Sequence, residues 1–559
     1  MRLCRQVRFA SRGVQAFMVL FLVSALSAQL PETRPQIGVP EDWTHHRIRF
    51  STAALREHPE LAAHEPRAAM QLYRDAFQRL RSAMAHSLAT PQEASPSTFQ
   101  PHRDWSIGLG GATVQFGAFP AKWNFDPTAA PSCTGDFVIF ALNEPGVTGG
   151  QPSIVGLNRL YSDGLNPLCP GFLQPNFLFS YNTTTVTNGK ILTSPILSID
   201  GKKVAFIETV NASFPNISIL HVLKIPTSGT QVLAAPSHNP PAGAMTSLIL
   251  GAASNTRSSP WIDYKSDTIY VGLDNGKLYK ITGVFNGTPV LAGAPFPLTI
   301  DPNRTLTSPM LDITTGKLFV GAGNGTLYSV NVNSPAGVTT IQVGRAGSPN
   351  PDIYDAPMFD ATGGSIFAMT SNDDVSNGST VVQVNTSTFA VTTRVSIGQG
   401  STNGQMINLY DGDFDNAYFT NPSTGHLMVC GTGPASPTPY RYRLSFNASG
   451  VLQPATGVQI STNGNGRCSP ITNFFNPNIG GGTDFFFWGV TRCSSGTGCV
   501  MALANNTTLS QLTVPGGTSG IILDNTYVNP TFTGGSSIYF ASQNGNSSAA
   551  FKATQQGLQ

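Results

Sequence analysis

Four cationic residues precede prolines at related distances along the chain. Lys190 and Arg304 lie five residues before a proline, and Arg257 and Arg467 lie three before one. Both offsets are odd, so in extended chain the four side chains project from the same face. If these prolines open strands around a common channel, the cations would gather at one mouth and attract an anion. The alternative is four solvated charges in polar turns.

Three carboxylates alternate with other residues in the segment Asp411-Gly412-Asp413-Phe414-Asp415. Oxygen ligands at alternating positions suit calcium, although the later bidentate Glu of a calcium loop is missing. Asp411 also belongs to a recurring set that follows predicted first strands and includes Asp200, Asp263, Asp312 and Asp360. Such repetition favours a turn role, in which Asp bonds its own backbone. A calcium site and a set of turn residues therefore both remain open.

Familiar catalytic patterns are missing from the sequence. It contains no phosphate-binding Walker loop, no zinc-protease helix motif and no nucleophile elbow. Adjacent side chains in extended chain point apart, so His45-His46 fit surface or packing roles better than a metal site. Only His221, His238 and His426 lie beyond residue 105, which leaves few histidines for a site there.

The positions that could do chemistry sit within a repeated pattern. An opening Ser-Pro or a variant is followed by an aromatic-rich strand, a turn with glycine and a third strand, and self-similarity of this kind indicates a repeat fold. The repeats open at Pro120, Pro195, Pro260, Pro309, Pro357, Asn408-Leu409, Pro470 and Pro530. The second strands are β-branched or aromatic, as buried strands prefer. Eight such units predict an all-β fold, an eight-bladed β-propeller over residues 105–559.

The two ends of the repeat region complement each other. The last unit reaches its third strand near Ala550-Phe551-Lys552 and leaves no room for a fourth. A spare strand, Trp105–Leu109, precedes the first unit. We expect this strand to pair with the last unit and close the ring, which removes two open sheet edges.

The repeats resemble those of the quinoprotein-type, or PQQ-like, propellers. The resemblance rests on the Ser-Pro openings, on Tyr270-Val271-Gly272, on Asn275-Gly276-Lys277-Leu278-Tyr279 and on the outer Trp105-Ser106-Ile107. The chain also resembles uncharacterised secreted bacterial proteins, through Asp42–His46 and Phe119–Lys122. The resemblance implies that a quinoprotein dehydrogenase would carry adjacent cysteines at its cofactor and a repeated tryptophan docking motif. This chain has only five tryptophans and no Cys-Cys pair, so we expect no bound quinone and no cofactor other than the calcium considered above.

The N-terminal part is predicted to lie outside the propeller. Residues 1–28 combine basic residues, a short apolar run and small residues, which predicts a secretory signal peptide; the alternative is an uncleaved anchor. Residues 29–104 form a helical extension and linker, with a helix from Pro66 whose apolar stripe docks on the propeller. No later stretch is apolar enough for a membrane helix.

Six cysteines follow the predicted signal peptide, an even number that favours disulfides in an exported chain. Cys493 and Cys499 flank Ser-Ser-Gly-Thr-Gly and could face each other across a hairpin. The other candidate pairs are Cys133 with Cys169, which share the first repeat, and Cys430 with Cys468, the two that remain. Free buried thiols are the alternative.

Charged residues make up 11% of the chain, well below the usual quarter or so. The formal charge of +2 falls to about −2 without Arg2, Arg5, Arg8 and Arg12, so no nucleic-acid partner is expected. We predict a secreted, periplasmic or extracellular monomer that binds a protein or glycan at the channel mouth without catalysis. The alternatives are an enzyme acting there on an oligosaccharide or other anionic substrate, and a structural envelope protein.

Overall fold

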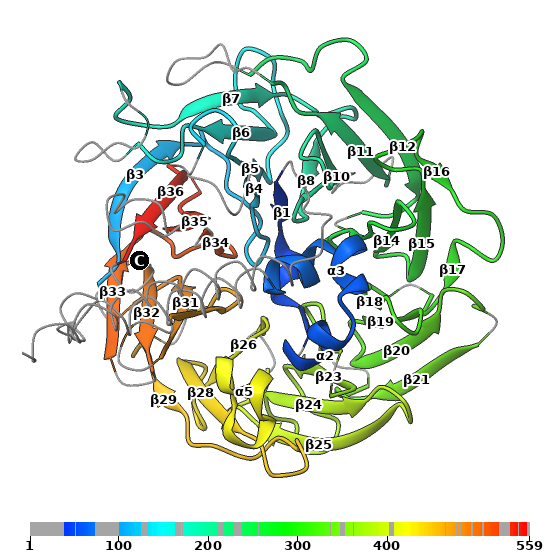
Figure 1. Cartoon of the computed structure of the whole chain (residues 1–559), viewed down its shortest axis with the longest axis vertical. Helices are drawn as coiled ribbons and strands as arrows, with labels where there is room; N and C mark the ends of the chain where they lie inside the picture. The colour runs from blue at the N-terminus through cyan, green and yellow to red at the C-terminus, as the bar shows by residue number, and fades with distance from the viewer. Residues whose placement is uncertain are drawn as a thin grey trace, which may run out of the picture.

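Short apolar strands and tight turns fold into eight sheets around a central axis in this computed structural model, which Figure 1 views down that axis. The chain is an eight-bladed β-propeller, and the predicted fold class is confirmed. The second strands make up the interior of the blades; Phe137–Ala141, for example, is buried along its whole length. Apolar β-branched and aromatic side chains suit such positions because both faces of each blade pack against neighbours.

The structure describes residues 38–555 apart from 51, 73–99, 125–131, 163–168, 170, 211–215, 228–236, 255, 303, 336, 347–352, 362, 402–406, 464–465, 477–478, 480–481, 494–495, 506–507, 525–536 and 546. The predicted signal peptide, most of the predicted helical stripe and the proposed linker lie outside these residues. Residues 66–72 are helical, as predicted from Pro66 onward.

The first blade consists of β4 (Ala121–Asn124), β5 (Phe137–Ala141), β6 (Ile154–Asn158) and β7 (Asn176–Tyr181). The second consists of β8 (Gly189–Ile191), β9 (Ile196–Leu197), β10 (Lys203–Val210), β11 (Ser218–Lys224) and β12 (Met245–Gly251), and the third of β13 (Trp261–Asp263), β14 (Thr268–Gly272), β15 (Lys277–Thr282), β16 (Val290–Leu291) and β17 (Leu298–Thr299). The fourth consists of β18 (Met310–Asp312), β19 (Lys317–Gly321), β20 (Thr326–Asn331) and β21 (Val338–Gln342).

The fifth blade consists of β22 (Met358–Asp360), β23 (Ser365–Thr370), β24 (Thr380–Asn385) and β25 (Ala390–Ser396), and the sixth of β26 (Asp413–Phe414), β27 (His426–Thr432), β28 (Pro439–Ser445) and β29 (Val458–Gln459). The seventh consists of β30 (Thr472–Asn476), β31 (Thr483–Val490), β32 (Cys499–Ala504) and β33 (Thr508–Thr513). The eighth consists of β34 (Ile522–Asp524), β35 (Ser537–Ala541), β36 (Ala549–Thr554) and β3 (His102–Gly108). Short helices η1 (Trp43–His46), α2 (Thr52–Glu57), α3 (Glu60–His64), α5 (Asn416–Thr420) and η3 (Pro422–Thr424) complete the elements.

The serines of the Ser-Pro openings tie neighbouring blades together. The Phe119 backbone N–H donates to Ser194 Oγ at 2.9 Å, the Ser194 N–H to Ser259 Oγ at 2.8 Å, and the Ser259 N–H to Ser308 Oγ at 2.7 Å. Each bond pairs the buried backbone N–H of the residue that precedes a proline. The proline itself has no N–H to offer. The serines of the second, third and fourth blades therefore link the first four blades around the channel.

Two glycines show why the turns between second and third strands need this residue. Gly276 and Gly325 have φ of +71° and +77°, a region that favours glycine. A Cβ on Gly276 would lie 1.7 Å from the carbonyl oxygen of Asp301, and one on Gly325 would lie 2.5 Å from Gly344 Cα. The turns are thus fixed both by backbone conformation and by close packing.

The ring closes as predicted. β3 pairs antiparallel with β36, with Ser106 opposite Phe551 and Ile107 opposite Ala550. One predicted opening is wrong: the inner strand of the last blade is Ile522–Asp524, upstream of Pro530. Ile521 directly precedes this strand, where several other blades carry proline, and Gly520 stands where Ser259 and Ser308 precede those prolines. A Cβ on Gly520 would lie 2.4 Å from the Phe119 ring. The missing proline hid this opening from the sequence pattern.

All six cysteines pair in the structure. The bonds join Cys133 to Cys169, Cys430 to Cys468 and Cys493 to Cys499, with Cα–Cα distances of 5.5, 6.3 and 6.1 Å. All three distances suit disulfides, which persist in oxidising compartments.

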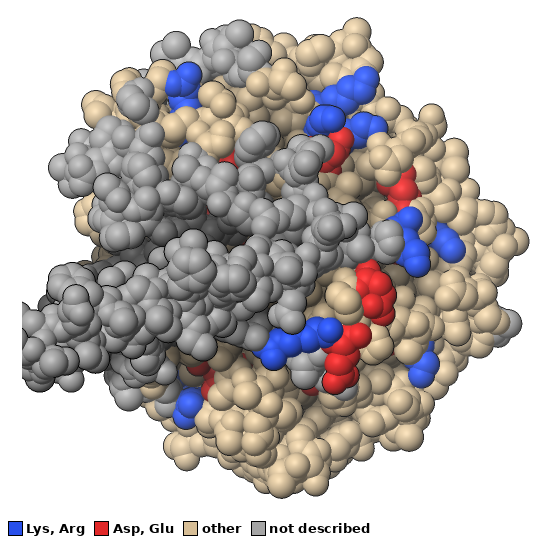
Figure 2. Space-filling view, in the orientation of Figure 1, with Lys and Arg blue, Asp and Glu red and all other residues tan. Residues whose placement is uncertain are grey.

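In the described part of the chain, no helix has the length and apolar character needed to cross a membrane. Figure 2 shows acidic and basic side chains scattered among large neutral areas on the described part of one face, as expected from the low charged content.

Candidate functional site

The segment 38–72, here called the plug, enters the central channel (Figure 1). Its first strand, β1 (Val39–Glu41), pairs antiparallel with β4, the inner strand of the first blade. Its second, β2 (Ile48–Arg49), pairs in parallel with β22 of the fifth blade. Helix η1 connects the two strands, and α2 and α3 follow. The plug thus adds an innermost strand to two blades on different sides of the channel.

Apolar and aromatic contacts hold the turn of the plug within the channel. Trp43 packs edge-on against Trp261 with ring centroids 6.0 Å apart, and its indole Nε1–H donates to the carbonyl oxygen of Pro260. His46 stacks on Phe119 at 5.0 Å, and His45 Nδ1 accepts a hydrogen bond from the Asp42 backbone. The two adjacent histidines are therefore buried packing residues in the plug.

Ion pairs fasten the plug to the fifth and sixth blades. Arg47 contacts Asp355 at 2.6 Å and also pairs with Asp411. Arg49 contacts Asp413 at 2.6 Å. Burial lowers the pKa of Arg47, although Asp355 opposes this effect, and burial raises the pKa of Asp355 and Asp413 despite their arginine partners. Separating these groups would leave buried charges without their partners, so the pairs resist withdrawal of the plug.

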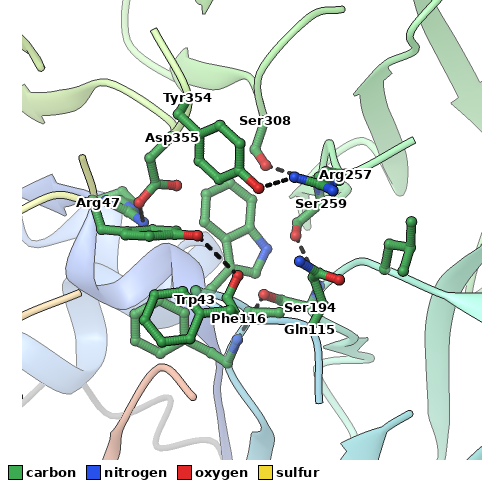
Figure 3. A pocket seen from close by; sticks show the side chains of 15 residues that line it. Trp43, Arg47, Gln115, Phe116, Ser194, Arg257, Ser259, Ser308, Tyr354 and Asp355 are labelled. Carbon is green, nitrogen blue, oxygen red and sulfur yellow. Dashed lines mark hydrogen bonds and ion pairs between the residues drawn. The ribbon is translucent and has the colours of Figure 1, made fainter. Parts of the chain in front are cut away.

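A pocket that opens to solvent, with a cavity volume of about 40 Å³, lies where the plug meets one mouth of the channel (Figure 3). Loops that precede the inner strands of six blades line it, and Trp43 and Arg47 contribute the wall on the plug side. The lining residues are Trp43, Arg47, Gln115, Phe116, Gly117, Ala118, Phe119, Leu192, Ser194, Arg257, Ser259, Ser308, Tyr354, Asp355 and Tyr410. Because the plug fills the channel behind it, the pocket is a dead end.

One wall of the pocket is a row of aromatic rings that ends at an arginine. Phe116 meets Tyr410 edge-on at 5.2 Å, and Tyr410 meets Tyr354 at 5.4 Å. Burial raises the pKa of Tyr410 well above its ordinary value, so this phenol stays neutral and donates to the carbonyl oxygen of Phe116. The Arg257 guanidinium lies 5.4 Å from the centre of the Tyr354 ring and donates to its hydroxyl.

Arg257 is the charged group that this pocket offers to a ligand. Its side chain is exposed, whereas the buried Arg47 is neutralised by carboxylates. Gln115 adds a half-buried amide, for which no side-chain hydrogen bond is found among the described residues. Asp355 is the one carboxylate among the described lining residues, and Arg47 holds it. The arrangement can hold an anion beside aromatic faces, and its described lining residues include no second carboxylate for acid–base chemistry.

Of the four cations singled out in the sequence, Arg257 lines the pocket and the other three are not among its lining residues. Lys190 lies in β8 opposite Thr209, and Arg304 follows a turn at Asp301. The Arg467 backbone pairs with Thr491. A shared anion site for all four stays a prediction.

The carboxylates considered for calcium have other partners in this structure. Asp411 and Asp413 face the plug arginines, whereas Asp415 caps α5 and lies 2.7 Å from His426. No group of three or more His, Cys, Asp or Glu side chains within the described residues is arranged to hold a metal ion. Calcium binding by these three residues stays a prediction.

The turn role predicted for the recurring aspartates holds for most of them. Asp200, Asp263, Asp312 and Asp360 each accept a hydrogen bond from the backbone of the turn that follows. Asp411 differs because it precedes β26 instead of following it, and its carboxylate serves the plug. The shift arises because this inner strand starts at Asp413, later than the variant opening at Asn408 indicated.

The sequence analysis missed the residues that shape the pocket around Arg257. Trp43 and Arg47 come from the extension, and Tyr354 and Tyr410 come from loops without a distinctive motif. One signal was available: Trp43, Arg47 and Arg49 stand close together in a chain with few charges and five tryptophans. That clustering is unusual for an exposed linker.

No protein-family model and no curated protein matches this chain. Among solved structures, BamB from Moraxella catarrhalis is 13% identical, with a TM-score of 0.40 over 81% of this chain and 99% of that one. The WD40 domain of coronin from Toxoplasma gondii is 13% identical, with a TM-score of 0.37 over 63% of this chain and 79% of the other. Likenesses this distant carry no argument about function, which has to come from the site itself.

Proposed function

We propose that this protein is a secreted, non-catalytic binding module whose ligand, an acidic glycan, enters the dead-end pocket at the channel mouth. The observation that carries the proposal is the exposed Arg257 at the end of the row Phe116, Tyr410 and Tyr354. A guanidinium binds a carboxylate through paired, charge-assisted hydrogen bonds. The propeller loops fix its position in advance, so little ordering is needed on binding.

The neighbouring groups favour a sugar as the carrier of that anion. Phe116 and Tyr354 are half-buried and offer ring faces on which the C–H face of a sugar can pack. The Gln115 amide supplies donors and an acceptor for hydroxyl groups. The ring faces and the amide together offer a sugar both apolar contact and hydrogen bonds.

Binding fits the pocket better than catalysis on a glycan does. Glycoside hydrolysis ordinarily needs two carboxyl groups on opposite sides of the scissile bond. Asp355 is the one carboxylate among the described lining residues, and its ion pair with Arg47 engages it. An enzyme acting on an oligosaccharide at this mouth would need acidic groups from elsewhere.

Export is part of the proposal. The basic and apolar character of residues 1–28 is typical of a secretory signal. The three disulfides fit an oxidising compartment such as the periplasm or the cell exterior.

The test is titration calorimetry of the full chain with tetragalacturonate, and with maltotetraose as the neutral counterpart. We expect Arg257→Met to weaken tetragalacturonate binding about 10- to 150-fold, the worth of one charge-assisted hydrogen bond. Arg345→Met removes an exposed cation that does not line the pocket and is not among the four predicted cations, so it is the matched control. Equal affinity for the neutral sugar, equal loss in both variants, or binding of a protein but no acidic glycan would overturn the proposal.

A further inference from the structure

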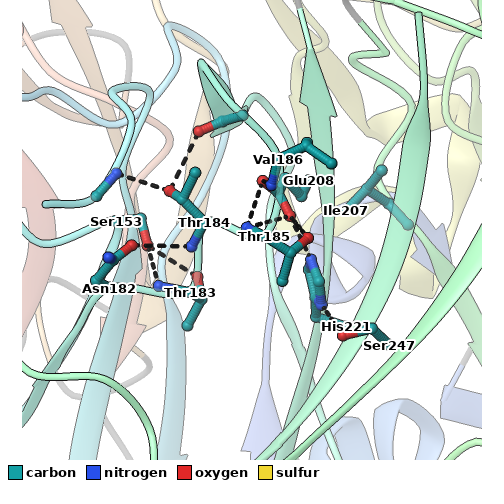
Figure 4. Close-up of polar contacts among 12 residues, drawn as sticks. Ser153, Asn182, Thr183, Thr184, Thr185, Val186, Ile207, Glu208, His221 and Ser247 are labelled. Atoms are coloured by element: carbon teal, nitrogen blue, oxygen red, sulfur yellow. Dashed lines mark hydrogen bonds and ion pairs between the residues drawn. The ribbon is translucent and has the colours of Figure 1, made fainter. Parts of the chain in front are cut away.

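Three side chains on neighbouring strands of the second blade form a hydrogen-bonded line that the pocket does not involve (Figure 4). Ser247 Oγ lies 2.8 Å from His221 Nδ1, and His221 Nε2 lies 2.7 Å from Glu208 Oε2. They come from β12, β11 and β10 in that order. We propose that Ser247, His221 and Glu208 form a nucleophilic site that hydrolyses carboxylic esters with a small acyl group.

The sheet register places the three side chains on one face. His221 is directly opposite Ser247 on one side and Phe206 on the other. Directly opposed residues share a face, and Glu208, two positions after Phe206, shares it as well. The line therefore depends on rigid strands instead of loops, which suits a site that must keep hydrogen-bond geometry.

Glu208 is held as a buried carboxylate by several donors. Its oxygens accept from the Thr185 backbone at 3.0 and 3.1 Å, from Thr185 Oγ1 at 2.6 Å and from the Val186 backbone at 3.3 Å. A Cβ on Gly189 would lie 1.8 Å from Glu208 Oε1, so only glycine leaves room for it. Burial pushes the pKa of Glu208 up, but the bonds from His221 and Thr185 outweigh this and lower it.

The ionised carboxylate decides how the imidazole is protonated. It can only accept hydrogen bonds, so the proton of a neutral His221 belongs on Nε2. Nδ1 then carries the lone pair that accepts the Ser247 hydroxyl proton. A serine activated by a base that a third group orients is the general form of a nucleophilic triad. The two ring nitrogens are used here in the opposite order to that of the serine-protease triad.

Exposure separates the nucleophile from its supports. Ser247 is exposed, whereas the side chains of His221 and Glu208 are 0% and 2% exposed. β12 is the edge strand of its sheet, and an edge strand presents unpaired N–H groups that can stabilise an oxyanion. An open edge does not enclose a long acyl chain, so the fitting substrate is a small acyl group, such as acetyl, esterified to an alcohol.

The proposed reaction balances without a further reagent. Ser247 Oγ attacks the ester carbonyl carbon while its proton passes to His221 Nδ1. The carbon–oxygen bond to the alcohol then breaks, and the alcohol leaves with that proton. Water attacks the acyl-serine, His221 takes a proton from the water, and Ser247 recovers it as the acid departs. The net change is ester plus water to acid plus alcohol.

The test uses the full chain with p-nitrophenyl acetate, following nitrophenol release and locating the acetyl group by mass spectrometry of peptides. We expect acetylation of Ser247 and a rate at least about 100-fold lower in Ser247→Ala, within the usual range for base-assisted catalysis. Ser396→Ala removes an exposed serine on β25 of another blade and should leave the rate unchanged. Acetylation confined to other residues, or equal rates for wild type and Ser247→Ala, would overturn the proposal.

A second variant separates a positioning role of Glu208 from a merely structural one. Glu208→Gln keeps the size of the side chain but removes the charge that stabilises the imidazolium. If Glu208 positions and supports His221, the acidic limb of the rate profile moves to lower pH and the maximal rate falls. A folded Glu208→Gln protein with an unchanged rate profile would contradict this role, even if Ser247 were acetylated.

Discussion

Replacing Arg47 by Met tests whether buried ion pairs hold the plug in the channel. The substitution keeps a long apolar stem but removes the cation between Asp355 and Asp411, whose side chains are 17% and 1% exposed. Breaking a buried pair by removing one partner costs about 3–5 kcal/mol, because a charge remains buried without compensation. We expect the free energy of unfolding to fall by that amount at pH 8.

The pH dependence of this loss identifies its cause. Without Arg47 the pKa of Asp355, already raised by burial, rises further, because no cation then opposes the burial. The folded variant then binds a proton more readily than its unfolded chain, so its stability falls as pH rises through this pKa. The loss relative to wild type should be largest at pH 8 and should shrink at pH 4.

Urea unfolding followed by tryptophan fluorescence measures the loss, since Trp43 and Trp261 pack together where the plug enters. Hydrogen exchange over residues 38–72 shows whether the plug opens before the blades do. Lys202→Met breaks an exposed ion pair with Asp200 and should cost less than about 1 kcal/mol. Adding Asp355→Asn and Asp411→Asn to Arg47→Met should recover most of the loss. A loss below about 1 kcal/mol, or one equal at pH 4 and pH 8, would refute the reasoning.

Three other predictions concern stability. Burial, together with the charges of Asp415 and Asp413, raises the pKa of Asp484 to about 7, although Asn416 and Asn473 donate to it. The folded state then holds a proton between pH 4 and 7 that the unfolded chain lacks, so the free energy of unfolding falls as pH rises through this range. In urea unfolding, Asp484→Asn should raise the free energy of unfolding by up to about 4 kcal/mol at pH 8 and leave it unchanged at pH 4. Replacing Cys133 and Cys169 by Ser should lower the free energy of unfolding by about 4 kcal/mol, and replacing Cys493 and Cys499 should lower it by about 2 kcal/mol. The first loss is larger because the Cys133–Cys169 disulfide closes a longer loop, whose release gives the unfolded chain more entropy. The reverse order in urea unfolding would contradict this. Trp105→Ala should cost about 3–5 kcal/mol by calorimetry, since its buried ring packs where the ring closes; a smaller loss than that of an exposed Leu173→Ala would exclude this role.

The repeats made most of the fold predictable. Ser-Pro openings, aromatic strands and glycine turns recur, so each copy supports the interpretation of the others. The closing strand at Trp105 followed from counting strands. The last opening was mistaken because Gly520-Ile521 replaces the Ser-Pro of other blades. The close approach of Gly520 to Phe119, which lies far away in the sequence, could not be foreseen.

The site was less predictable because its residues occur once and meet across long stretches of chain. Arg47 is 308 residues from Asp355, and Arg49 is 364 from Asp413. The parity argument selected Arg257, but its partner Tyr354 is 97 residues away. Glu208 and Ser247 are 13 and 26 residues from His221, and only the register of three strands brings them into line.

The ring closure and the plug also determine when this chain can finish folding. Both β3 and the plug precede the blades in the chain, yet their partners Phe551, Asp413 and Asp355 follow much later. Proteins usually fold from the N-terminal end as they emerge, and distant pairings form slowly. Here the first segments to emerge must wait for the last. A chain cut short before the final blade would leave β3 without its partner strand, so closure of the ring requires β36 to have been synthesised.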